Sequence, residues 1–351
     1  MDYKYRYKRL VSNNETLKYL IAQYKMYQLL VIVTLFTFAT SSVILTDKEW
    51  TLFKETHGKT YLNSEEETYR KNIFNENLKK IKLHNEKAIR GEHSYQLGIT
   101  KFADLTINET KMPEIEVEPQ PLDVKFHHKS YFKAPESVDW RTKGILTRIK
   151  DQGACPSCWA FTGAAVIEAA YAQATGKLVN LSAQDILDCA PKSKGCTIGF
   201  VSTGYQYAMS KGLRLENCYP YESHDDLFGQ KACKVNSECD RIKIKDFVYV
   251  PRYNENALRD AVAEHVVARY IYADLQDFVF YKEGIYNSPN CPKDKITHLV
   301  PIVGYGTENG TPYWIFKNSW GEHWGENGYG RILRGNNTCG IAIYNSSYPR
   351  I

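Results

Sequence analysis

Residues 152–161 read Gln-Gly-Ala-Cys-Pro-Ser-Cys-Trp-Ala-Phe, and the second cysteine opens a long alanine-rich helical pattern. This pattern covers residues 158–175 and stops before Gly176, a residue that suits the position just after a helix. Free N–H groups and the positive end of the helix dipole favour a thiolate at Cys158, and the thiolate is the reactive form of cysteine. Because buried structural cysteines are far commoner than catalytic ones, the stretch alone is weak evidence for a nucleophile.

All nine cysteines lie between Cys155 and Cys339. An odd count in one segment fits four disulfides and one free thiol in an oxidising compartment. The alternative is a set of buried reduced thiols. A targeting signal near the amino terminus favours the disulfides.

That signal is the uncharged segment 26–46, whose apolar core, residues 29–39, has the length of a signal-peptide core. We expect entry into the secretory pathway and cleavage of the signal. Residues 1–25 are longer than a normal leading region, so either translation starts at Met26 or the segment stays as an uncleaved anchor. Five Asn-x-Ser/Thr sequons suit a glycoprotein on this route: Asn108, Asn180, Asn309, Asn336 and Asn345.

The composition indicates a globular protein, because 43% of its 351 residues are hydrophobic and 24% are charged. The length allows about two domains plus extra segments. The net charge of +5 is spread along the chain, which argues against a nucleic-acid surface. The cysteines suit disulfides better than zinc, so we expect neither a metal nor a cofactor.

Residues 48–85 are charged and carry apolar residues at helical spacing, which predicts two amphipathic helices broken near Gly58. Residues 112–123 are rich in proline and acidic residues, and we expect an exposed, cleavable linker there.

After Ala134 the sequence becomes rich in cysteine, glycine and aromatic residues. A helix is predicted over residues 254–267, with Asn254 as its cap. Helices first and strands later indicate an α+β architecture with two lobes. The predicted strands include residues 299–305, 313–317 and 328–333.

The segment around Cys158 resembles the active-site motif of papain-like cysteine proteases, and other motifs follow in that family's order. The resemblance covers residues 48–351 and implies the family's α+β fold, with a helical left lobe and a β-barrel-like right lobe, preceded by a helical propeptide. The supporting motifs are Val138-Asp139-Trp140-Arg141, Leu181-Ser182 to Asp188-Cys189, Gly195-Cys196-Thr197-Ile198-Gly199, Thr297-His298-Leu299-Val300 and Lys317-Asn318-Ser319-Trp320-Gly321.

The resemblance implies four catalytic residues. Cys158 is expected to be the nucleophile, and His298 its imidazolium partner and the proton donor to the leaving amine. Asn318 is expected to hold the imidazole ring, and Trp320 to cover their hydrogen bond. Gln152 is expected to donate its side-chain amide to the oxyanion, beside the N–H of Cys158.

The resemblance also implies the substrate-binding residues. Tyr270, Leu299 and Tyr344 take positions in the pocket for the side chain two residues upstream of the scissile bond, where many relatives carry smaller residues. We therefore expect a small pocket that prefers Ala or Val to Phe. The other substrate-binding residues that the resemblance implies are Gly199 for the extended substrate backbone, Phe200 and Val201 at the pocket entrance, Trp320, and Trp324 on the leaving-group side.

The amino-terminal half resembles the inhibitory propeptide of cathepsin L-like zymogens. From periodicity alone, a solvated charged helix would be the preferred interpretation. The uncharged segment predicts an amino-terminal extension with a signal peptide or anchor at 1–46, and the resemblance predicts a propeptide at 47–111, a linker at 112–133 and a peptidase domain at 134–351. Two motifs support it: Glu66, Arg70, Phe74, Asn77, Ile81 and Asn85 along one helix face, and then Gly98, Thr100, Phe102 and Asp104.

The disulfides that the resemblance implies are Cys155–Cys196, Cys189–Cys233 and Cys291–Cys339. Cys218 and Cys239 are left over and would be available for a fourth.

Besides the large residues of the upstream pocket, two residues depart from the family's pattern. Pro156 replaces a glycine, which removes an N–H and fixes φ near −65° before the nucleophile. Ile198 replaces the first glycine of a pair in the substrate loop, where the substrate backbone must approach closely. Both favour an alternative function, a catalytically weak homologue that binds or inhibits other proteins.

The complete set of four catalytic residues favours a cysteine endopeptidase made as an inactive zymogen. Its expected partners are peptide and protein substrates and its own propeptide, and we expect a monomer. Its expected setting is lysosomal or extracellular, with membrane contact only if the amino-terminal segment is uncleaved.

Overall fold

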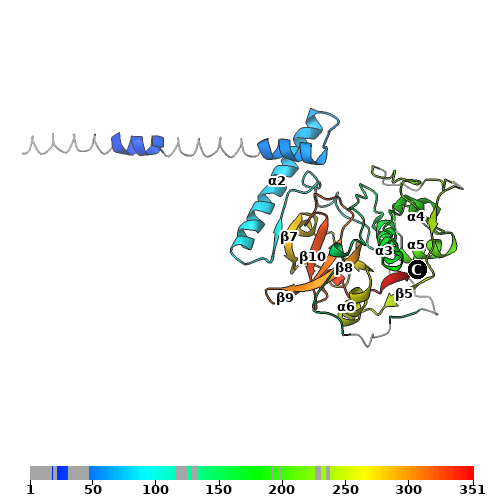
Figure 1. Cartoon of the computed structure of the whole chain (residues 1–351). Helices are drawn as coiled ribbons and strands as arrows, with labels where there is room; N and C mark the ends of the chain where they lie inside the picture. Colours follow the sequence, from blue (N-terminus) through cyan, green and yellow to red (C-terminus); the bar gives the residue numbers. More distant parts are fainter. Residues whose placement is uncertain are drawn as a thin grey trace, which may run out of the picture. The chain divides into compact units, whose positions relative to one another are not determined.

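The computed structural model describes residues 18, 22–30, 47–115, 125–127, 133–191, 193, 195–197, 199–225, 231–234 and 238–351. The chain divides into two compact units, Met1–Lys71 and Asn72–Ile351 (Figure 1). Most of the predicted signal segment, residues 31–46, lies outside the described residues, as does Ile198. Within the described ranges, no helix has both the length and the apolar character that crossing a membrane requires.

The first unit contains a helix at residues 47–57 and the start of α2 (Ser64–Ile89). Gly58 separates the two helices and adopts a φ of 59°, which glycine tolerates without a Cβ clash. Trp50 stacks on Phe53 and Tyr61, with ring centroids 5.5 and 5.6 Å apart. The predicted pair of helices with a break near Gly58 is confirmed.

The helical lobe of the second unit is built around α3 (Cys158–Thr175), which is mostly buried except for its exposed last turn. Its many alanines and Gly163 let α4 (Ala183–Cys189) and α5 (Val201–Ser210) pack closely against it. Gly176 ends α3 in the left-handed conformation, with a φ of 72°, as the sequence predicts.

The second lobe is a sheet that has nine strands among the described residues (Figure 1). Its central antiparallel strands are buried and rich in β-branched and aromatic residues. The α+β architecture predicted from the sequence is confirmed. The strand order is β1 (Tyr95–Leu97), β7 (Tyr281–Tyr286), β10 (Tyr329–Leu333), β9 (Thr311–Lys317), β8 (His298–Glu308), β6 (Val267–Ile271), β11 (Ser346–Arg350) and β5 (Asp246–Val250), with β2 (Val138–Asp139) paired to β8.

Shorter elements complete the second unit. The helix predicted over 254–267 is α6 (Glu255–Glu264), capped by the side chain of Asn254. It ends three residues early because His265 is extended and the next residues enter β6. The other elements are η1 (Trp140–Lys143), α7 (Gln276–Val279), η2 (Thr338–Gly340) and a two-stranded antiparallel sheet of β3 (Leu213–Arg214) and β4 (Arg241–Ile242).

Both ends of the large sheet pair with residues that precede the predicted peptidase domain. At one end, β1 is antiparallel to β7. At the other end, residues 125–127 lie along β5: His127 N donates to Tyr249 O (2.7 Å) and Tyr249 N to Lys125 O (2.9 Å). Lys125 also pairs with Asp246, at 2.6 Å.

The predicted linker is not uniformly exposed. Ile115 is buried and its N–H donates to Ile296 O at 3.0 Å. The expectation of an exposed segment is therefore wrong at this residue, because an isolated isoleucine between acidic residues finds an apolar surface on the larger unit.

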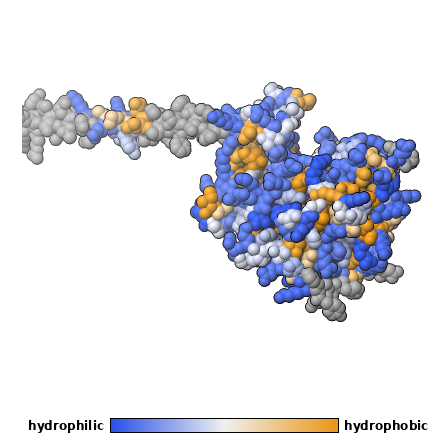
Figure 2. Space-filling model, viewed as in Figure 1, coloured by the Kyte–Doolittle hydropathy of each residue, from blue (hydrophilic) through white to orange (hydrophobic). Residues whose placement is uncertain are grey.

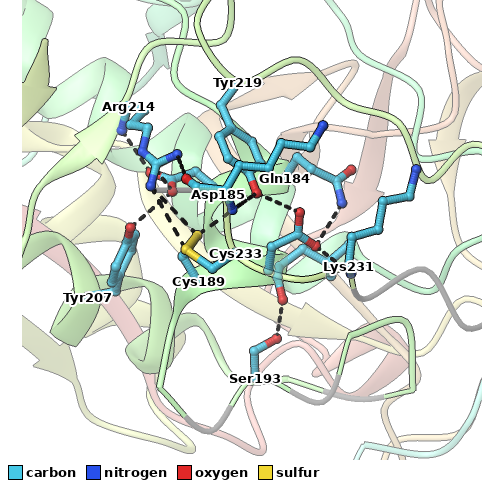
Figure 3. The surroundings of a disulfide bond; sticks show 12 residues. Gln184, Asp185, Cys189, Ser193, Tyr207, Arg214, Tyr219, Lys231 and Cys233 are labelled. Carbon is cyan, nitrogen blue, oxygen red and sulfur yellow. Dashed lines mark hydrogen bonds and ion pairs between the residues drawn. A yellow bond between two sulfur atoms is a disulfide. The ribbon is translucent and has the colours of Figure 1, made fainter. Parts of the chain in front are cut away.

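The structure contains four disulfides, and Cys158 is its free cysteine among the described residues. The bonds join Cys155–Cys196, Cys189–Cys233, Cys218–Cys239 and Cys291–Cys339. Figure 3 shows Cys189–Cys233 beside the buried pair Arg214–Asp185, whose Nε and Oδ1 atoms are 3.5 Å apart. The hydroxyl of Tyr207 donates to the same carboxylate, at 3.0 Å.

The visible surface of the second unit is mostly hydrophilic (Figure 2). Many of its buried apolar side chains form a core that α3 shares with strands β6 and β8, and further large aromatic residues such as Phe278, Trp314 and Trp324 are buried outside this core. The amino-terminal end of α3 and the start of β8 meet at this core.

Candidate active site

The turn before α3 holds Cys158 at the first position of the helix. Gly153 has a φ of 65°, and a Cβ there would lie 2.1 Å from His224 O, so only glycine fits. Ser157 N donates to Cys155 O at 2.7 Å, which closes a three-residue turn around Pro156. A central residue with negative φ suits such a turn, so Pro156 fits without displacing Cys158 from the helix.

His298 is the first residue of β8 and is completely buried. Its Nε2 lies 2.9 Å from Asn318 Oδ1, and Trp320 packs over the ring with centroids 4.9 Å apart. Asn318 Oδ1 also accepts the N–H of Ser319 at 2.8 Å. The contact with Ser319 N–H identifies this atom as the amide oxygen, which can only accept hydrogen bonds. The imidazole must therefore donate to it, so Nε2 carries the proton.

The other imidazole nitrogen, Nδ1, is buried and has no hydrogen-bond partner among the described residues. With Nε2 protonated, neutral His298 has a lone pair on Nδ1. Cys158 lies close by, since the backbone of Leu299, the next residue after His298, acts on its thiol. Cys158 therefore lies beside the two neighbours of His298 in the chain, since Thr297, Leu299 and Cys158 line one small cavity.

Burial controls the ionisation of both groups. It raises the pKa of the Cys158 thiol to about 12, against smaller opposing effects of nearby backbone N–H groups. It lowers the pKa of His298 to about 4, although the hydrogen bond to Asn318 acts in the opposite direction. The sequence suggests a lowered thiol pKa at the helix end, but in this closed structure burial outweighs that effect and both groups are neutral.

Three hydrogen bonds to Cys155 and Ser319 fix Gln152 in the turn before Cys158. Its Nε2 donates to Cys155 O (2.9 Å), its Oε1 accepts from Ser319 Oγ (2.7 Å), and its backbone N–H donates to Ser319 O (2.9 Å). Ser319 is therefore a positioning residue that the sequence analysis did not identify. Its place between Asn318 and Trp320 was the available signal.

Residues 72–115, here termed the prosegment, lie against this site. Pro113 and Ile115 line a cavity of about 10 Å³ together with Cys158, Gly199 and Leu299. Phe102 packs edge-on against Trp320, with centroids 5.2 Å apart. Lys101 forms an ion pair with Asp151, the neighbour of Gln152. Little space remains at the nucleophile.

The three large residues predicted for the upstream pocket lie together. Tyr270 and Leu299 are cross-strand partners on β6 and β8. The ring of Tyr344 lies 5.8 Å from that of Tyr270. Phe200 caps the start of α5, which begins at buried Val201.

Two other predicted binding residues have different surroundings. A Cβ on Gly199 would lie 2.1 Å from the ring of Trp159, so packing alone excludes a side chain there. Trp324 is 1% exposed, and its Nε1 donates to Val279 O at 3.1 Å. In this form of the protein Trp324 supports Trp320, 5.3 Å away, from within the core.

A buried charge cluster behind the site was also missed. Lys150 pairs with Glu168 (3.0 Å) and Glu216 (3.1 Å), and Lys317 donates to Thr147 O (2.7 Å). Lys317 directly precedes Asn318, and burial lowers its pKa to about 8. No spacing in the sequence signals this cluster, because its members come from four separate segments. The described residues contain no group of three or more His, Cys, Asp or Glu arranged to hold a metal ion.

Two family models match the chain. Residues 134–349 match the papain family cysteine protease model, and residues 50–110 match the cathepsin propeptide inhibitor domain.

Curated relatives and solved structures agree with these matches. The chain is 38% identical over 323 residues to cathepsin K of Mus musculus, covering 90% of this chain and 96% of the relative. It is 40% identical over 314 residues to cathepsin S of Bos taurus, covering 87% and 93%. Digestive procathepsin L 3 from the larval midgut of Tenebrio molitor superimposes with a TM-score of 0.79 at 33% identity, covering 88% of this chain and 99% of that one. The recombinant stem bromelain precursor gives 0.77 at 34% identity, covering 87% and 99%. The chain therefore belongs to the papain family of cysteine proteases, as a cysteine-type endopeptidase that carries a cathepsin-type propeptide.

Proposed function

We propose that this endopeptidase hydrolyses peptide bonds through a Cys158 thiolate and a His298 imidazolium. The observation that carries the proposal is the hydrogen bond from His298 Nε2 to Asn318 Oδ1, which leaves Nδ1 as the unpaired base near the thiol. Transfer of the thiol proton to Nδ1 would create the ion pair once the site opens to water, because water stabilises both charges.

The reaction follows from these positions. The thiolate attacks the scissile carbonyl carbon, the imidazolium gives its proton to the leaving nitrogen, and the C–N bond breaks to leave a thioester. Water, deprotonated by the same imidazole, then hydrolyses the thioester and restores the thiol. Asn318 keeps the ring in one orientation throughout.

Gln152 is suited to stabilise the oxyanion. An amide NH₂ has two donors, and one of them is used by Cys155 O. The second donor is available for the negative oxygen of the tetrahedral intermediate, beside the N–H groups at the start of α3. Because Ser319 and Cys155 fix the amide beforehand, little reorganisation is needed during the reaction.

Residues 47–111 act, in this proposal, as an inhibitory propeptide, residues 112–133 as the linker, and residues 134–351 as the peptidase domain. The contacts of Pro113, Ile115 and Phe102 at Cys158 and Trp320 support it, since they exclude substrate from the nucleophile. The four disulfides support passage through the secretory pathway to a lysosomal or extracellular location.

The proposal is tested with an epoxide directed at cysteine proteases, applied to acid-processed protein. Wild type should be labelled at Cys158 and hydrolyse peptides, whereas Cys158→Ala should do neither while keeping the same thermal unfolding. Labelled protein without peptide hydrolysis would indicate a weak homologue, and hydrolysis by Cys158→Ala would exclude the mechanism.

A further inference from the structure

Asp274 is a buried carboxylate to which the mechanism gives no task. It lies between β6 and α7 and is 8% exposed. Its Oδ1 has no hydrogen-bond partner among the described residues. A buried carboxylate oxygen without a partner is unfavourable unless a ligand or another chain completes it.

Thr297, the residue before His298, connects this carboxylate to the catalytic site through hydrogen bonds. Thr297 N donates to Ile271 O (3.0 Å), and Thr297 Oγ1 accepts the N–H of Ala273 (3.0 Å). Its hydroxyl proton is thus free to interact with Asp274, and it stabilises the charged form. The negative charge of Asp274 in turn acts on Cys158.

The prosegment shows on which side of the nucleophile Asp274 lies. Lys111 and the backbone of Met112 act on Asp274, whereas Pro113 and Ile115 reach Cys158 and Leu299. The prosegment therefore passes from Asp274, across the nucleophile, to the upstream pocket.

The packing of α7 agrees with this direction. Phe278 of α7 lies 5.9 Å from the ring of Trp320 and 5.5 Å from that of Trp324, so the helix that follows Asp274 packs against the tryptophan that covers His298. Asp274 therefore precedes a helix that packs against Trp324, the residue that the family resemblance places on the leaving-group side.

We propose that Asp274 is a specificity-determining residue that binds a Lys or Arg side chain in the first two substrate residues after the scissile bond. The inference rests on the proposed function of Cys158. Lys111 of the prosegment is the cation that acts on this carboxylate in the zymogen, and its removal leaves the site open to a substrate cation. An ion pair shielded from bulk water at this depth is stronger than one on the surface.

The preference for a cation depends on pH. Burial raises the pKa of Asp274 to about 6, against the effects of Thr297, Met112 and Lys111. The other titratable groups that sense its charge are Cys158 on α3 and Tyr272 beyond β6, whereas the pKa of His298 is lowered by burial against the opposing hydrogen bond to Asn318. An acid with a raised pKa loses its charge as the pH falls through about 6, so the preference should be present at pH 7 and weak at pH 5.

The test uses quenched peptides that differ only in Lys or Gln at each of the first two positions after the scissile bond. Processed wild type should favour Lys by roughly tenfold in kcat/KM at pH 7, and by much less at pH 5. Asp274→Asn should abolish the preference, and Asp274→Glu should retain part of it. The matched control is Asp294→Asn, which removes an exposed carboxylate and changes the net charge equally.

Binding to processed Cys158→Ala separates this inference from the proposed function. Tighter binding of the Lys peptide, lost in Cys158→Ala/Asp274→Asn, would support the subsite even if hydrolysis failed. The inference would be overturned if protein with intact Asp274 bound and cleaved the Lys and Gln peptides equally well. It would also be overturned if the Lys preference survived Asp274→Asn. Asp274 would then be a structural partner of Thr297.

Discussion

At Cys158, the helix end and burial act in opposite directions on the thiol. The first turn of α3 supplies N–H groups that favour the thiolate, yet burial raises the pKa of the thiol to about 12. The same enclosure lowers the pKa of His298 to about 4. Prosegment residues Pro113 and Ile115 contribute to this enclosure, so the zymogen is restrained by ionisation as well as by steric exclusion.

Alkylation at different pH values should separate these two restraints. At pH 7, Cys158 of the zymogen should react with iodoacetamide at least about 100-fold more slowly than Cys158 of the processed enzyme, because a thiol with a pKa of about 12 has almost no thiolate there. The zymogen rate should rise steadily up to pH 10, whereas the processed enzyme should already react rapidly at pH 6. A zymogen rate independent of pH would mean that access alone is limiting.

The side chain of Leu299 should decide which residue the upstream pocket accepts. Leu299→Ala should raise kcat/KM for Phe relative to Ala at this substrate position by roughly tenfold, since it removes volume beside Tyr270. A substrate series varied only there measures the ratio. Leu178→Ala, an exposed position, is the control and should leave the ratio unchanged. A wild-type preference for Phe that the mutation does not alter would show that the pocket lies elsewhere.

Among the elements, β1 holds the prosegment to the sheet through a contact that depends on one glycine. Gly284 of β7 has a φ of 95°, and a Cβ there would lie 2.5 Å from Ser94 O. Gly310, in the turn after β8, has a φ of 81° but no atom within 4 Å of its Cβ position. An alanine would strain the backbone at both positions, because both have positive φ. Only at Gly284 would its Cβ also clash with Ser94.

Gly284→Ala should therefore loosen the prosegment, whereas Gly310→Ala should not. Overpacking of this kind costs about 1–3 kcal/mol, which corresponds to roughly tenfold faster epoxide labelling of the uncleaved zymogen. The thermal unfolding temperatures of both variants measure how much each substitution destabilises the protein through backbone strain alone or with the added clash. Equal labelling of the two variants would indicate that β1 is not what holds the prosegment in place.

The elements also show where sequence patterns are informative. The boundaries of α3 follow from its alanines and from Gly176, and β8, β9 and β10 follow from their aromatic and β-branched runs. The pairing of β1 with β7 was not predicted, because three residues carry no period. Asp274 and the Lys150–Glu168 pair were missed for a similar reason: their environment is created by segments that are distant in sequence.

For the whole molecule, the route to an active enzyme is constrained by residues 125–127. Their backbone is bound to β5 and Lys125 is paired with Asp246. Arg350 and Lys125 hold the pKa of Asp246 at about 2, so this carboxylate stays charged at pH 4–5 and acid of that strength does not break the pair.

Acid processing should therefore yield an active enzyme whose new amino terminus lies between residues 112 and 134 but not within 125–127. A protease needs the backbone to be free, and the backbone of these residues is hydrogen-bonded to Tyr249 of β5. Amino-terminal sequencing of the processed protein measures the position. Cleavage inside 125–127, or full activity of the uncleaved chain at neutral pH, would contradict this account.

The two pairings at the ends of the sheet have a joint consequence. An outermost strand offers a row of unsatisfied N–H and C=O groups to any neighbouring chain, and natural proteins shield such rows against self-association. In this molecule β1 shields β7 and residues 125–127 shield β5. A peptidase domain synthesised without its leading segments would expose both rows before its disulfides had formed, and aggregation would compete with its folding.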